Sequence, residues 1–471
     1  MEKALRVCNS IARLTAPTGA ERKLVHRLAE HLKAKLVHEA KRQGLDAEVR
    51  VDGSVAKDTW LRGDADIDIF LRVPTSLSRV ELEARCLDVA KRALKGHAIV
   101  ERFAEHPYVE THVDGVRVNV VPCYRVAQGE WRSATDRTPF HTDYVLSHLS
   151  PIQKKEVRLL KAFLKGIGVY GADVKVSGFS GMLCETLIMY HGSFTKTLQE
   201  AQSWKTPAMI DLEHYYKGRE NELTDLFEEP LVVVDPVDHG RNLAASISRR
   251  KLWEFVAAAR AFSKNPKQSF FVPRRTVPLS VDGFRREMRR RGWNLIAIEF
   301  GKVDAVIDVV WSQLYRTERA LRNVLRQEGY DVIRSSSWTD EECLNLILLE
   351  LESLNLPPVR KHVGPQVARS QASEQFLQKH LRESRSISGP WVDEDTWAVD
   401  QLRENTNATA FLQSRLRNGG RDAGVASKIA RSLKRRHRVI AAEALLAFYR
   451  KNTNVARFIT DFLKGRPTWL G

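Results

Sequence analysis

The sequence is most constrained by a short apolar stretch that carries an aspartate at every second position. Residues 64–73 have the sequence DADIDIFLRV, in which Asp64, Asp66 and Asp68 alternate with apolar residues in a run otherwise typical of a buried strand. Side chains two apart in a strand point to the same face, so the three carboxylates share one face. Asp is depleted in strands and like charges side by side repel. Such a strand is best explained if its acidic face binds cations.

Divalent cations fit this face. Mg²⁺ takes hard oxygen ligands and commonly uses one or two protein carboxylates plus substrate phosphates. The Cα atoms of Asp66 and Asp68 are expected about 6.6 Å apart, so their side chains can converge on two metal ions spaced about 3.5–4 Å. Asp64 lies about 13 Å from Asp68, too far to share one metal with it, and is expected to be solvated or behind the metal ligands.

A second motif precedes the acidic strand. Gly53-Ser54 follows the alternating segment AEVRVD, and eleven residues separate Ser54 from Asp66. Glycine lets the backbone approach a phosphate, and serine offers a hydroxyl and an N–H. Gly-Ser, a spacer and Asp-x-Asp on a strand resemble the nucleotidyltransferases of the DNA polymerase beta type. The alternative is an edge strand with solvated aspartates, against which Ile67 and Ile69 argue for burial.

Composition narrows the partner and the compartment. The 471 residues contain 75 Lys and Arg against 58 Asp and Glu, a formal charge of +17, which indicates a polyanionic partner such as nucleic acid. The alternative is a charge that only favours solubility. The five cysteines form no CxxC pair, and neither a signal peptide nor an 18-residue apolar run is present, so we expect a cytoplasmic protein without a membrane segment.

The order of helical and strand patterns predicts an α+β multidomain chain. Residues 1–148 alternate helices and strands, including a hairpin around Asp114-Gly115. Residues 149–265 have mainly helical periodicity. Residues 266–471 begin with the β-α-β rhythm of a ferredoxin-like or RNA-recognition unit and continue into a tail of polar loops and helices. We therefore predict three domains with these boundaries.

Longer motifs extend the resemblance over most of the chain. From about residue 20 to beyond 365 the sequence is similar to the archaeal-type (class I) CCA-adding enzymes, which are tRNA nucleotidyltransferases. The similarity weakens in the last hundred residues. It rests on motifs that occur in the family's order: EHPYVE, VVPCY, DRTPFH, EVRLLKAFLKGIGVYGADVKVSGFSG, LCE, VVDPVD and VGPQ.

The resemblance implies a fold and an activity. The fold would be a polymerase-beta-type head with a mixed sheet, a helical middle domain and a C-terminal ferredoxin-like unit with a helical tail. The activity would be addition of C, C and A to the 3′ end of tRNA from CTP and ATP without a nucleic-acid template, using two Mg²⁺ ions. The partner would be the acceptor stem and T arm of tRNA, and a homodimer is possible.

The resemblance also implies roles for individual residues. Asp66 and Asp68 correspond to the first two metal carboxylates. The side chains that would hold or read the nucleotide are Ser54 and Lys57 at the triphosphate turn, Thr138 and His141 near the nucleotide and acceptor end, Lys161 and Tyr170 of the helical domain, and Arg241 at the base edge. Ordinary solvated charge is the alternative for Lys161 and Arg241, and a structural role is the alternative for His141.

One position departs from the family pattern. Asn119 stands where the third carboxylate is expected, and asparagine offers a metal a carbonyl oxygen but no charge. It also cannot act as a general base on the attacking 3′-hydroxyl. Asn119 is therefore either a replacement introduced to trap a complex or a natural variant with changed activity.

The basic clusters suggest where RNA binds. They lie in FRREMRRRGW, with Arg289 and Arg290, and in SKIARSLKRRHR, with Arg431 and Arg435, where helical spacing puts basic residues on one face. A solvated helix face is the alternative for the second cluster. Two other functions stay open: another nucleotidyltransferase, such as a poly(A) polymerase or a second-messenger synthase, and a catalytically silent tRNA-binding protein.

Overall fold

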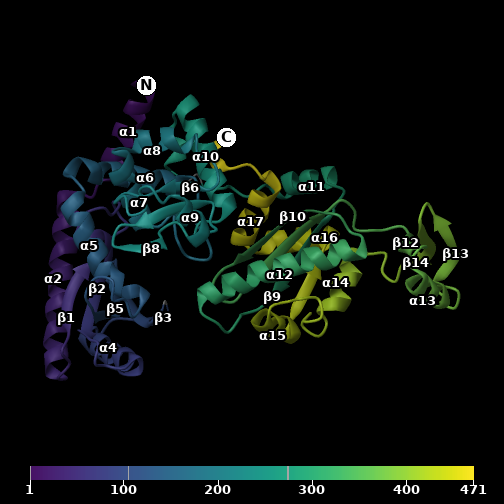
Figure 1. Cartoon of the computed structure of the whole chain (residues 1–471), viewed down its shortest axis with the longest axis horizontal. Coiled ribbons are helices and arrows are strands. Elements are labelled where there is room, and N and C mark those ends of the chain that lie inside the picture. Colours follow the sequence, from purple (N-terminus) through teal and green to yellow (C-terminus); the bar gives the residue numbers. More distant parts are fainter. Residues whose placement is uncertain (1, 104, 273–274, 471) are drawn as a thin grey trace. The chain divides into compact units, whose positions relative to one another are not determined.

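The computed structural model describes residues 2–103, 105–272 and 275–470, which form two compact units (Figure 1). The first unit comprises Met1–Arg275 and the last residues, Arg466–Gly471, and the second comprises Thr276–Gly465. The first unit contains the mixed α/β and helical segments that the sequence predicts for residues 1–265. The return of the C-terminal residues to the first unit was not predicted.

The N-terminal half of the first unit is built on a mixed five-stranded sheet in the order β1-β2-β5-β4-β3. The β2–β5 pair is parallel, and the other neighbours are antiparallel. The elements of this head are α1 (Glu2–Thr15), α2 (Gly19–Arg42), β1 (Glu48–Asp52), α3 (Gly53–Lys57), β2 (Asp66–Pro74), α4 (Arg79–Ala93), β3 (Ile99–Phe103), β4 (Pro107–Val113), β5 (Val116–Arg125), η1 (Ala134–Asp136) and α5 (Arg137–His148).

Helices cover one face of this sheet and leave the acidic face free of that core. Ile67, Ile69 and Leu71 of β2 are fully buried in a cluster with residues of α2 and α4. Because successive side chains alternate, Asp66 and Asp68 lie on the opposite face. The shared face predicted for these two aspartates is confirmed. The strand begins at Asp66, so Asp64 precedes it, and the prediction that Asp64 also lies on this strand face is wrong.

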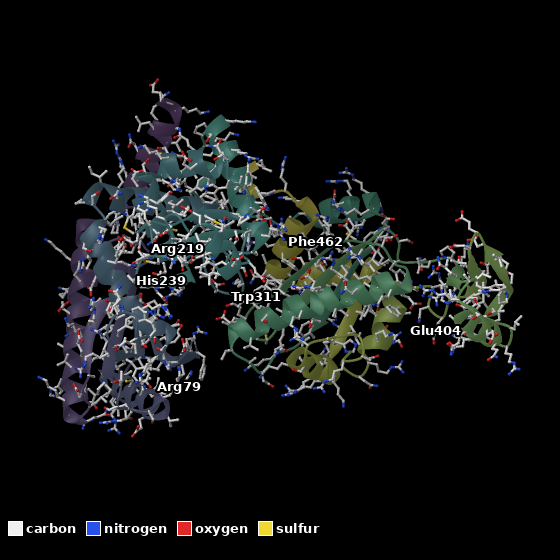
Figure 2. All side chains as sticks on the ribbon, viewed as in Figure 1. Arg79, Arg219, His239, Trp311, Glu404 and Phe462 are labelled. Atoms are coloured by element: carbon white, nitrogen blue, oxygen red, sulfur yellow. The ribbon has the colours of Figure 1, made fainter. Side chains whose placement is uncertain are left out.

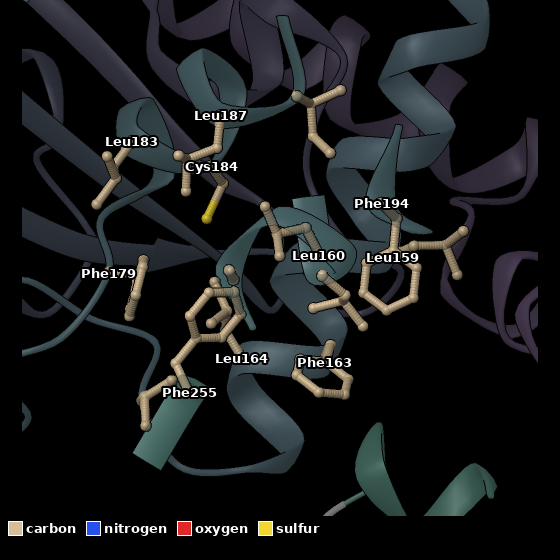
Figure 3. Close-up of a cluster of buried hydrophobic side chains, with 14 of the residues drawn as sticks. Leu159, Leu160, Phe163, Leu164, Phe179, Leu183, Cys184, Leu187, Phe194 and Phe255 are labelled. Carbon is tan, nitrogen blue, oxygen red and sulfur yellow. The ribbon is translucent and has the colours of Figure 1, made fainter. Parts of the chain in front are cut away.

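The second half of the first unit is mainly helical, with a small sheet in the order β6-β7-β8. Phe163 of α6 is its centre, and its ring is fully buried beside Phe194 and Phe255 (Figure 3). The ring lies 5.5–6.4 Å from the rings of Phe194, Phe255, Phe262, Phe270 and Phe271. The elements are α6 (Pro151–Gly166), α7 (Gly181–His191), α8 (Phe194–Ala201), β6 (Ala208–Ile210), α9 (Asn221–Leu226), β7 (Leu231–Asp235), β8 (Asp238–Asn242), α10 (Arg249–Lys264), η2 (Gln268–Phe270) and η3 (Thr468–Leu470).

The second unit contains the ferredoxin-like arrangement that the sequence predicts. Its antiparallel sheet has the order β10-β11-β9-β15, which is the split β-α-β pattern. Its elements are α11 (Val281–Arg290), β9 (Leu295–Phe300), α12 (Ile307–Glu328), β10 (Val332–Thr339), β11 (Asn345–Leu351), α14 (Ala408–Leu416), α15 (Ser427–Arg435), β15 (His437–Ile440), α16 (Ala442–Lys451) and α17 (Thr453–Lys464).

Helices cover both faces of this sheet. One face packs against α12, α14 and α15, and the other against α11, α16 and α17. Phe462, labelled in Figure 2, belongs to the second of these layers. The guanidinium carbon of Arg334 lies over the Phe462 ring, 4.6 Å from the ring centroid. The sheet is therefore enclosed on both faces by helices of this unit.

The C-terminal tail differs from the expectation of loops and helices only. Residues 359–402 form a separate three-stranded sheet with one helix: β12 (Val359–Gln366), α13 (Ser370–His380), β13 (Ser386–Asp393) and β14 (Thr396–Leu402). The short strand β15 then pairs with β9 in the main sheet. With only four residues, β15 carries too little alternation to be distinguished in sequence. Within the part of the chain that the structure describes, no helix is both long and apolar enough to span a membrane.

Candidate active site

A row of polar side chains crosses the open face of the head sheet. Asp52 of β1 lies opposite Asp68 of β2, and Asp68 lies opposite Asn119 of β5. The Nδ2 of Asn119 donates a hydrogen bond of 2.9 Å to Oδ1 of Asp68. One row further along the strands, Arg117 forms a two-point ion pair with Asp66. Asp66, Asp68 and Asn119, predicted as the metal-binding set, therefore lie side by side.

The electrostatics of Asp68 favour a cation. Burial raises the pKa of Asp68 to about 6, and the charge of Asp66 adds to this effect, against the opposing hydrogen bond from Asn119. A nearby divalent cation would stabilise the ionised carboxylate. Among the residues that the structure describes, no three His, Cys, Asp or Glu side chains are grouped as metal ligands. Position 119, where the resemblance implies a third carboxylate, carries the amide of Asn119 in this row.

Gly53 allows the backbone to pass close to Asp68. Its φ is +73°, and a Cβ at this position would lie 2.3 Å from Oδ2 of Asp68. Only glycine satisfies both conditions. The Gly53 N–H donates to Oγ1 of Thr142 on α5, at 3.3 Å, so this helix positions the turn that carries Ser54. Thr138 lies one helical turn before Thr142 and accepts its hydroxyl hydrogen bond at the backbone carbonyl.

Lys57 and Lys161 meet at a buried carboxylate that the sequence analysis did not single out. Nζ of Lys57 lies 2.6 Å from Oε2 of Glu185, and Nζ of Lys161 lies 3.2 Å from Oε1. Thr59 donates its hydroxyl to Oε1 of Glu185 at 2.5 Å. All four side chains are buried, and the head thereby contacts the helical half of the unit. Two ammonium groups share one carboxylate, so the cluster carries one excess positive charge.

Lys161 is buried, which contradicts the alternative of an ordinary solvated charge, and Lys57 is buried beside it. Burial would raise the pKa of Glu185, but the charges of Lys57 and Lys161 lower it to about 2. Burial lowers the pKa of Lys161, opposed by the charge of Glu185. Glu185 therefore stays ionised at neutral pH between the two lysine side chains. The sequence did point to Glu185, because this residue is the last of the LCE motif on which the family resemblance partly rests.

Tyr170 and Asp64 lie beside this cluster. Gly181, the first residue of α7, lies close to both Tyr170 and Lys161. A Cβ atom on Gly181 would lie 3.4 Å from the Tyr170 hydroxyl and 3.6 Å from Nζ of Lys161. Burial raises the pKa of Tyr170 well above its usual range, and the charges of Glu185, Asp64 and Asp66 are among the other causes. Asp64 forms an ion pair with Lys165, whose ammonium lies 5.3 Å from the Tyr170 ring centroid. Asp64 is therefore engaged by a lysine rather than placed with the metal-binding set.

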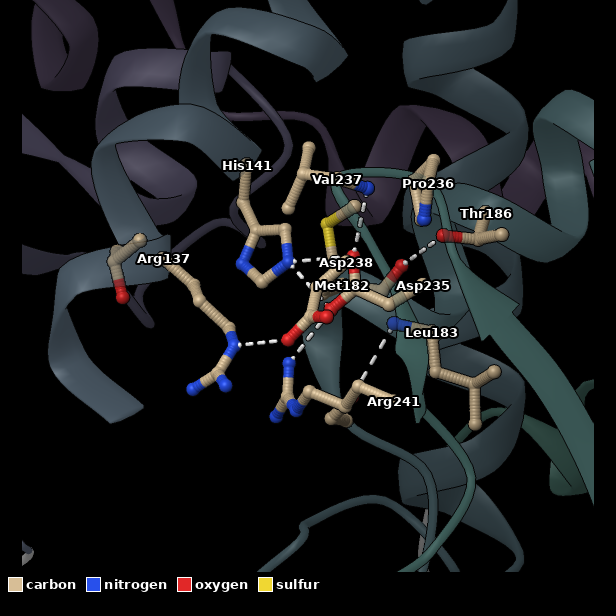
Figure 4. A network of polar contacts seen from close by, with 12 residues as sticks. Arg137, His141, Met182, Leu183, Thr186, Asp235, Pro236, Val237, Asp238 and Arg241 are labelled. Atoms are coloured by element: carbon tan, nitrogen blue, oxygen red, sulfur yellow. Dashed lines mark hydrogen bonds and ion pairs between the residues drawn. The ribbon is translucent and has the colours of Figure 1, made fainter. Parts of the chain in front are cut away.

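His141 and Arg241 converge on Asp235, which the sequence analysis also missed (Figure 4). Nε2 of His141 lies 2.9 Å and 2.8 Å from the two carboxylate oxygens, and Nη1 of Arg241 donates to Oδ2 at 2.8 Å. Asp235 is fully buried, whereas the Arg241 side chain is 42% exposed. Burial raises the pKa of Asp235, but its hydrogen bond with His141 and that residue's charge outweigh burial, and the pKa is lowered.

The Asp235 contacts fix the direction of Arg241. One nitrogen of its guanidinium is held by a buried carboxylate, and among the described residues the remaining donors have no hydrogen-bond partner, so they can meet a ligand. Beside it, Arg137 of α5 forms an ion pair of 2.6 Å with Asp238 of β8 (Figure 4). Asp235 and Asp238 are the two acids of VVDPVD, so this motif joins the head helix α5 to the helical half.

The predicted RNA-binding arginines lie in the second unit. Arg289 and Arg290 are exposed at the end of α11, and Arg290 contacts Glu287 at 3.4 Å. Arg431 and Arg435 are exposed on α15, which buries Ile429 and Leu433 on its other side. Both arginines line one shallow hollow, together with Lys302, Asp304, Lys428 and Ser432. The basic face predicted for this helix is therefore present, and its function stays a prediction.

The fold and these side chains define a nucleotidyltransferase. The family model described as "Nucleotidyltransferase domain" matches residues 33–141, "tRNA nucleotidyltransferase, second domain" matches 155–272, and "CCA-adding enzyme, C-terminal domain" matches 291–442. Together these matches cover more than half of the chain, and the chain belongs to the archaeal-type CCA-adding enzymes, the class I tRNA nucleotidyltransferases.

Curated relatives match along nearly the whole chain. A CCA-adding enzyme of Halobacterium salinarum is 36% identical over 433 residues, 91% of this chain and 93% of the relative. One of Methanopyrus kandleri is 36% identical over 481 residues, 98% and 97% of the two chains. One of Saccharolobus islandicus is 37% identical over 387 residues, 82% and 85% of the two chains. The predicted domain boundary after residue 148 falls between the first two matched segments, 33–141 and 155–272. The boundary after residue 265 falls inside the second of these segments. Both boundaries stay predictions.

Proposed function

We propose that this chain adds C, C and A to the 3′ end of tRNA by template-independent nucleotidyl transfer from CTP and ATP. The tRNA 3′-hydroxyl loses its proton to solvent as its oxygen forms a bond to the α-phosphorus, the bond from that phosphorus to the oxygen bridging to the β-phosphate breaks, and pyrophosphate leaves with that oxygen. The observation that carries the proposal is 36% sequence identity to two CCA-adding enzymes in alignments that cover 91% and 98% of this chain. It is supported by the carboxylates of Asp66 and Asp68 on the open sheet face.

Asp66, Asp68 and Asn119 are the residues that would hold the divalent cations. Their oxygens are hard donors of the type that Mg²⁺ prefers, and Oδ1 of Asn119 is buried without a hydrogen-bond partner among the described residues. When bound, two such ions stabilise the attacking and the leaving oxygens. Arg117 would have to release Asp66 as the cations bind, because it engages both carboxylate oxygens.

The triphosphate would be held by Ser54, Lys57, Lys161 and Tyr170. The excess positive charge of the Lys57–Glu185–Lys161 cluster supports this role, since a buried uncompensated charge is costly and a phosphate would neutralise it. Ser54, in the turn after Gly53, would add a hydroxyl and a backbone N–H. Glu185 then positions the two lysines.

The base would be read by Arg241, with Thr138 and His141 near the nucleotide and acceptor end. The support is that Asp235 holds one edge of the Arg241 guanidinium and His141 together, which leaves a planar, oriented set of donors. Cytosine and adenine both present acceptors that such donors can meet.

The tRNA would be held through its backbone by basic side chains of the second unit, with the acceptor stem and T arm as the parts bound. A-form RNA presents phosphates and 2′-hydroxyls, which suit exposed arginines such as Arg289, Arg290, Arg431 and Arg435. A homodimer and a cytoplasmic location stay predictions.

The test is nucleotide incorporation by the full-length chain on a tRNA transcript that lacks its CCA end. CTP alone should add two residues, ATP alone should add none, and both together should add three. Asp68→Asn should reduce incorporation by at least about 10²-fold while tRNA binding persists, because binding energy comes mostly from phosphate contacts elsewhere. Glu48→Asn, at an exposed residue of β1, is the control and should leave the rate unchanged.

The outcomes separate the other functions. Long A tracts from ATP alone would indicate a poly(A) polymerase, and a product free of RNA would indicate a second-messenger synthase. Binding of tRNA without incorporation would indicate a silent binding protein. Full activity of Asp68→Asn would refute the assignment of the metal site.

A further inference from the structure

The part of β8 that carries Arg241 also carries His239. The register of β8 against β7 shifts between Val234 and Asp235, and the extra residues 239–241 form a bulge in β8. Bulges are over-represented next to active sites, where they redirect side chains. The Cα atoms of His239 and Arg241 can be at most about 7 Å apart, because only two residues of chain separate them. Whatever ligand Arg241 contacts therefore lies within reach of the His239 side chain.

The imidazole of His239 packs against two tyrosine rings of the loop between β6 and α9. Its ring centroid lies 5.7 Å from that of Tyr215, with 50° between the ring planes, and 6.3 Å from that of Tyr216, with 65°. Both tyrosine hydroxyls donate to backbone carbonyls of the β7–β8 hairpin. Tyr215 donates to Pro236 at 2.7 Å, and Tyr216 donates to His239 itself at 2.9 Å. These two hydrogen bonds fix the tyrosine rings against the imidazole.

Exposure rises across this cluster from Tyr216 to His239. Tyr216 is buried, Tyr215 is 38% exposed, and His239 is exposed. The guanidinium of Arg219 lies over the Tyr216 ring, 5.8 Å from its centroid, so the buried ring is covered from another side (Figure 2 labels Arg219 and His239). Among the described residues, the His239 side chain makes no hydrogen bond or ion pair, and the tyrosines are its ring contacts. Packing explains the buried Tyr216, but the exposed imidazole is left available to a ligand.

A supported, exposed imidazole beside an oriented arginine suits a nucleobase. Bases stack on aromatic side chains, histidine included, and every base offers a π-face. The guanidinium of Arg241, held at one nitrogen by Asp235, presents further donors to acceptor atoms on the edge of a base (Figure 4). A contact with the edge can distinguish one base from another, whereas a contact with the face tolerates all bases.

We infer that His239 is a stacking residue for the nucleobase of the incoming CTP or ATP, with Tyr215 and Tyr216 holding its ring in place. This inference rests on the proposed function, because it requires Arg241 to lie at the base edge. His239 contributes affinity for both nucleotides, and Arg241 contributes the preference among bases.

The experiment measures binding of the non-reactive α,β-methylene analogues of CTP and ATP to the full-length chain by isothermal titration calorimetry, with a tRNA transcript that lacks its CCA end present. The variants are His239→Ala, His239→Leu and His239→Phe. The matched control is His148→Ala, because His148 is also exposed and also stacks on a tyrosine, Tyr144, at 4.2 Å and 21°. His148 ends α5, about 16 Å along the helix axis from Arg137, which contacts Asp238 of β8.

His239→Ala should weaken binding of both analogues by roughly 5-fold or more, the usual effect of removing one aromatic side chain from a stacked base. His239→Leu should lose as much although it keeps apolar bulk, and His239→Phe should retain most of the wild-type affinity, because the flat ring makes the contact. The preference between the analogues should stay as in the wild type, unlike in Arg241→Ala. His148→Ala should bind both analogues as the wild type does.

Wild-type affinity of His239→Ala for both analogues would overturn the inference, as would equal losses in His239→Leu and His239→Phe. If His239→Ala does not fold, the comparison of these last two variants decides. A loss in His239→Ala that is confined to tRNA binding, measured by filter binding without nucleotide, would place the imidazole at a base of the RNA and also overturn the inference. A wild-type chain that binds neither analogue would remove the proposed function and the inference together. A wild type that binds both, with an altered preference in Arg241→Ala and an unaffected His239→Ala, would remove the inference alone.

Discussion

Glu185 gives the sharpest test of how the head and the helical half are held together. Replacement by glutamine keeps the shape of the side chain but removes the charge that Lys57 and Lys161 share. The pKa of Glu185 falls from 4.5 to about 2 in the folded chain. That difference corresponds to about 3 kcal/mol of stability at neutral pH. The value agrees with the roughly 3–5 kcal/mol typical of a buried pair that loses one partner.

The pH dependence has a defined sign. Because the folded pKa is depressed, the carboxylate stabilises the fold above about pH 4.5, and this stabilisation is lost as the pH falls toward about 2. The difference in free energy of unfolding between the wild type and Glu185→Gln should therefore be constant from pH 7 to 5. It should shrink as the pH is lowered to 3.5.

The assay is urea denaturation followed by circular dichroism at pH 7, 5 and 3.5. The matched control is Glu254→Gln on α10, since Glu254 also contacts two basic residues, Arg250 and Lys251, both at 2.8 Å, but its side chain is 23% exposed and Arg250 is exposed. This control should lose less than about 1 kcal/mol. If Glu185→Gln loses no more than the control, or if its deficit is the same at pH 3.5 as at pH 7, the reasoning about the buried cluster is wrong.

Two further predictions concern the nucleotide and the RNA. Arg241→Ala should reduce kcat/KM for CTP and ATP and let UTP and GTP compete better, with the Mg²⁺ dependence unchanged, in a competition assay; an unaltered nucleotide preference would contradict base reading. Replacing Arg431 and Arg435 together by Gln should weaken binding of all tRNAs alike and reduce the slope of log affinity against log salt by roughly one unit per lost phosphate contact. A wild-type slope in that salt titration would exclude α15 from the RNA interface.

The sequence by itself determined the features that depend on neighbouring residues. Alternation placed Asp66 and Asp68 on one face of β2 and their isoleucine neighbours in the core. The turn at Asp114-Gly115, where both residues have positive φ, was recognisable because few residue types adopt that conformation. Motifs in a fixed order indicated the family, and helical spacing predicted the exposed basic face of α15.

Only the tertiary structure decided which charges meet. Glu185 lies 128 residues from Lys57, and Asp235 lies 94 residues from His141, so no local pattern pairs them. The contact between Tyr215 and His239 depends on how one loop packs against the β7–β8 hairpin, which also cannot be taken from either segment alone.

The same reason explains the strand that the sequence analysis missed. The four residues of β15 are held by pairing with β9, more than a hundred residues earlier in the chain, and not by their own alternation. Periodicity reports which face of an element is buried, because it depends on the geometry of one segment. The partner of a strand or of a buried charge depends on contacts between distant segments, and these form only when the chain packs.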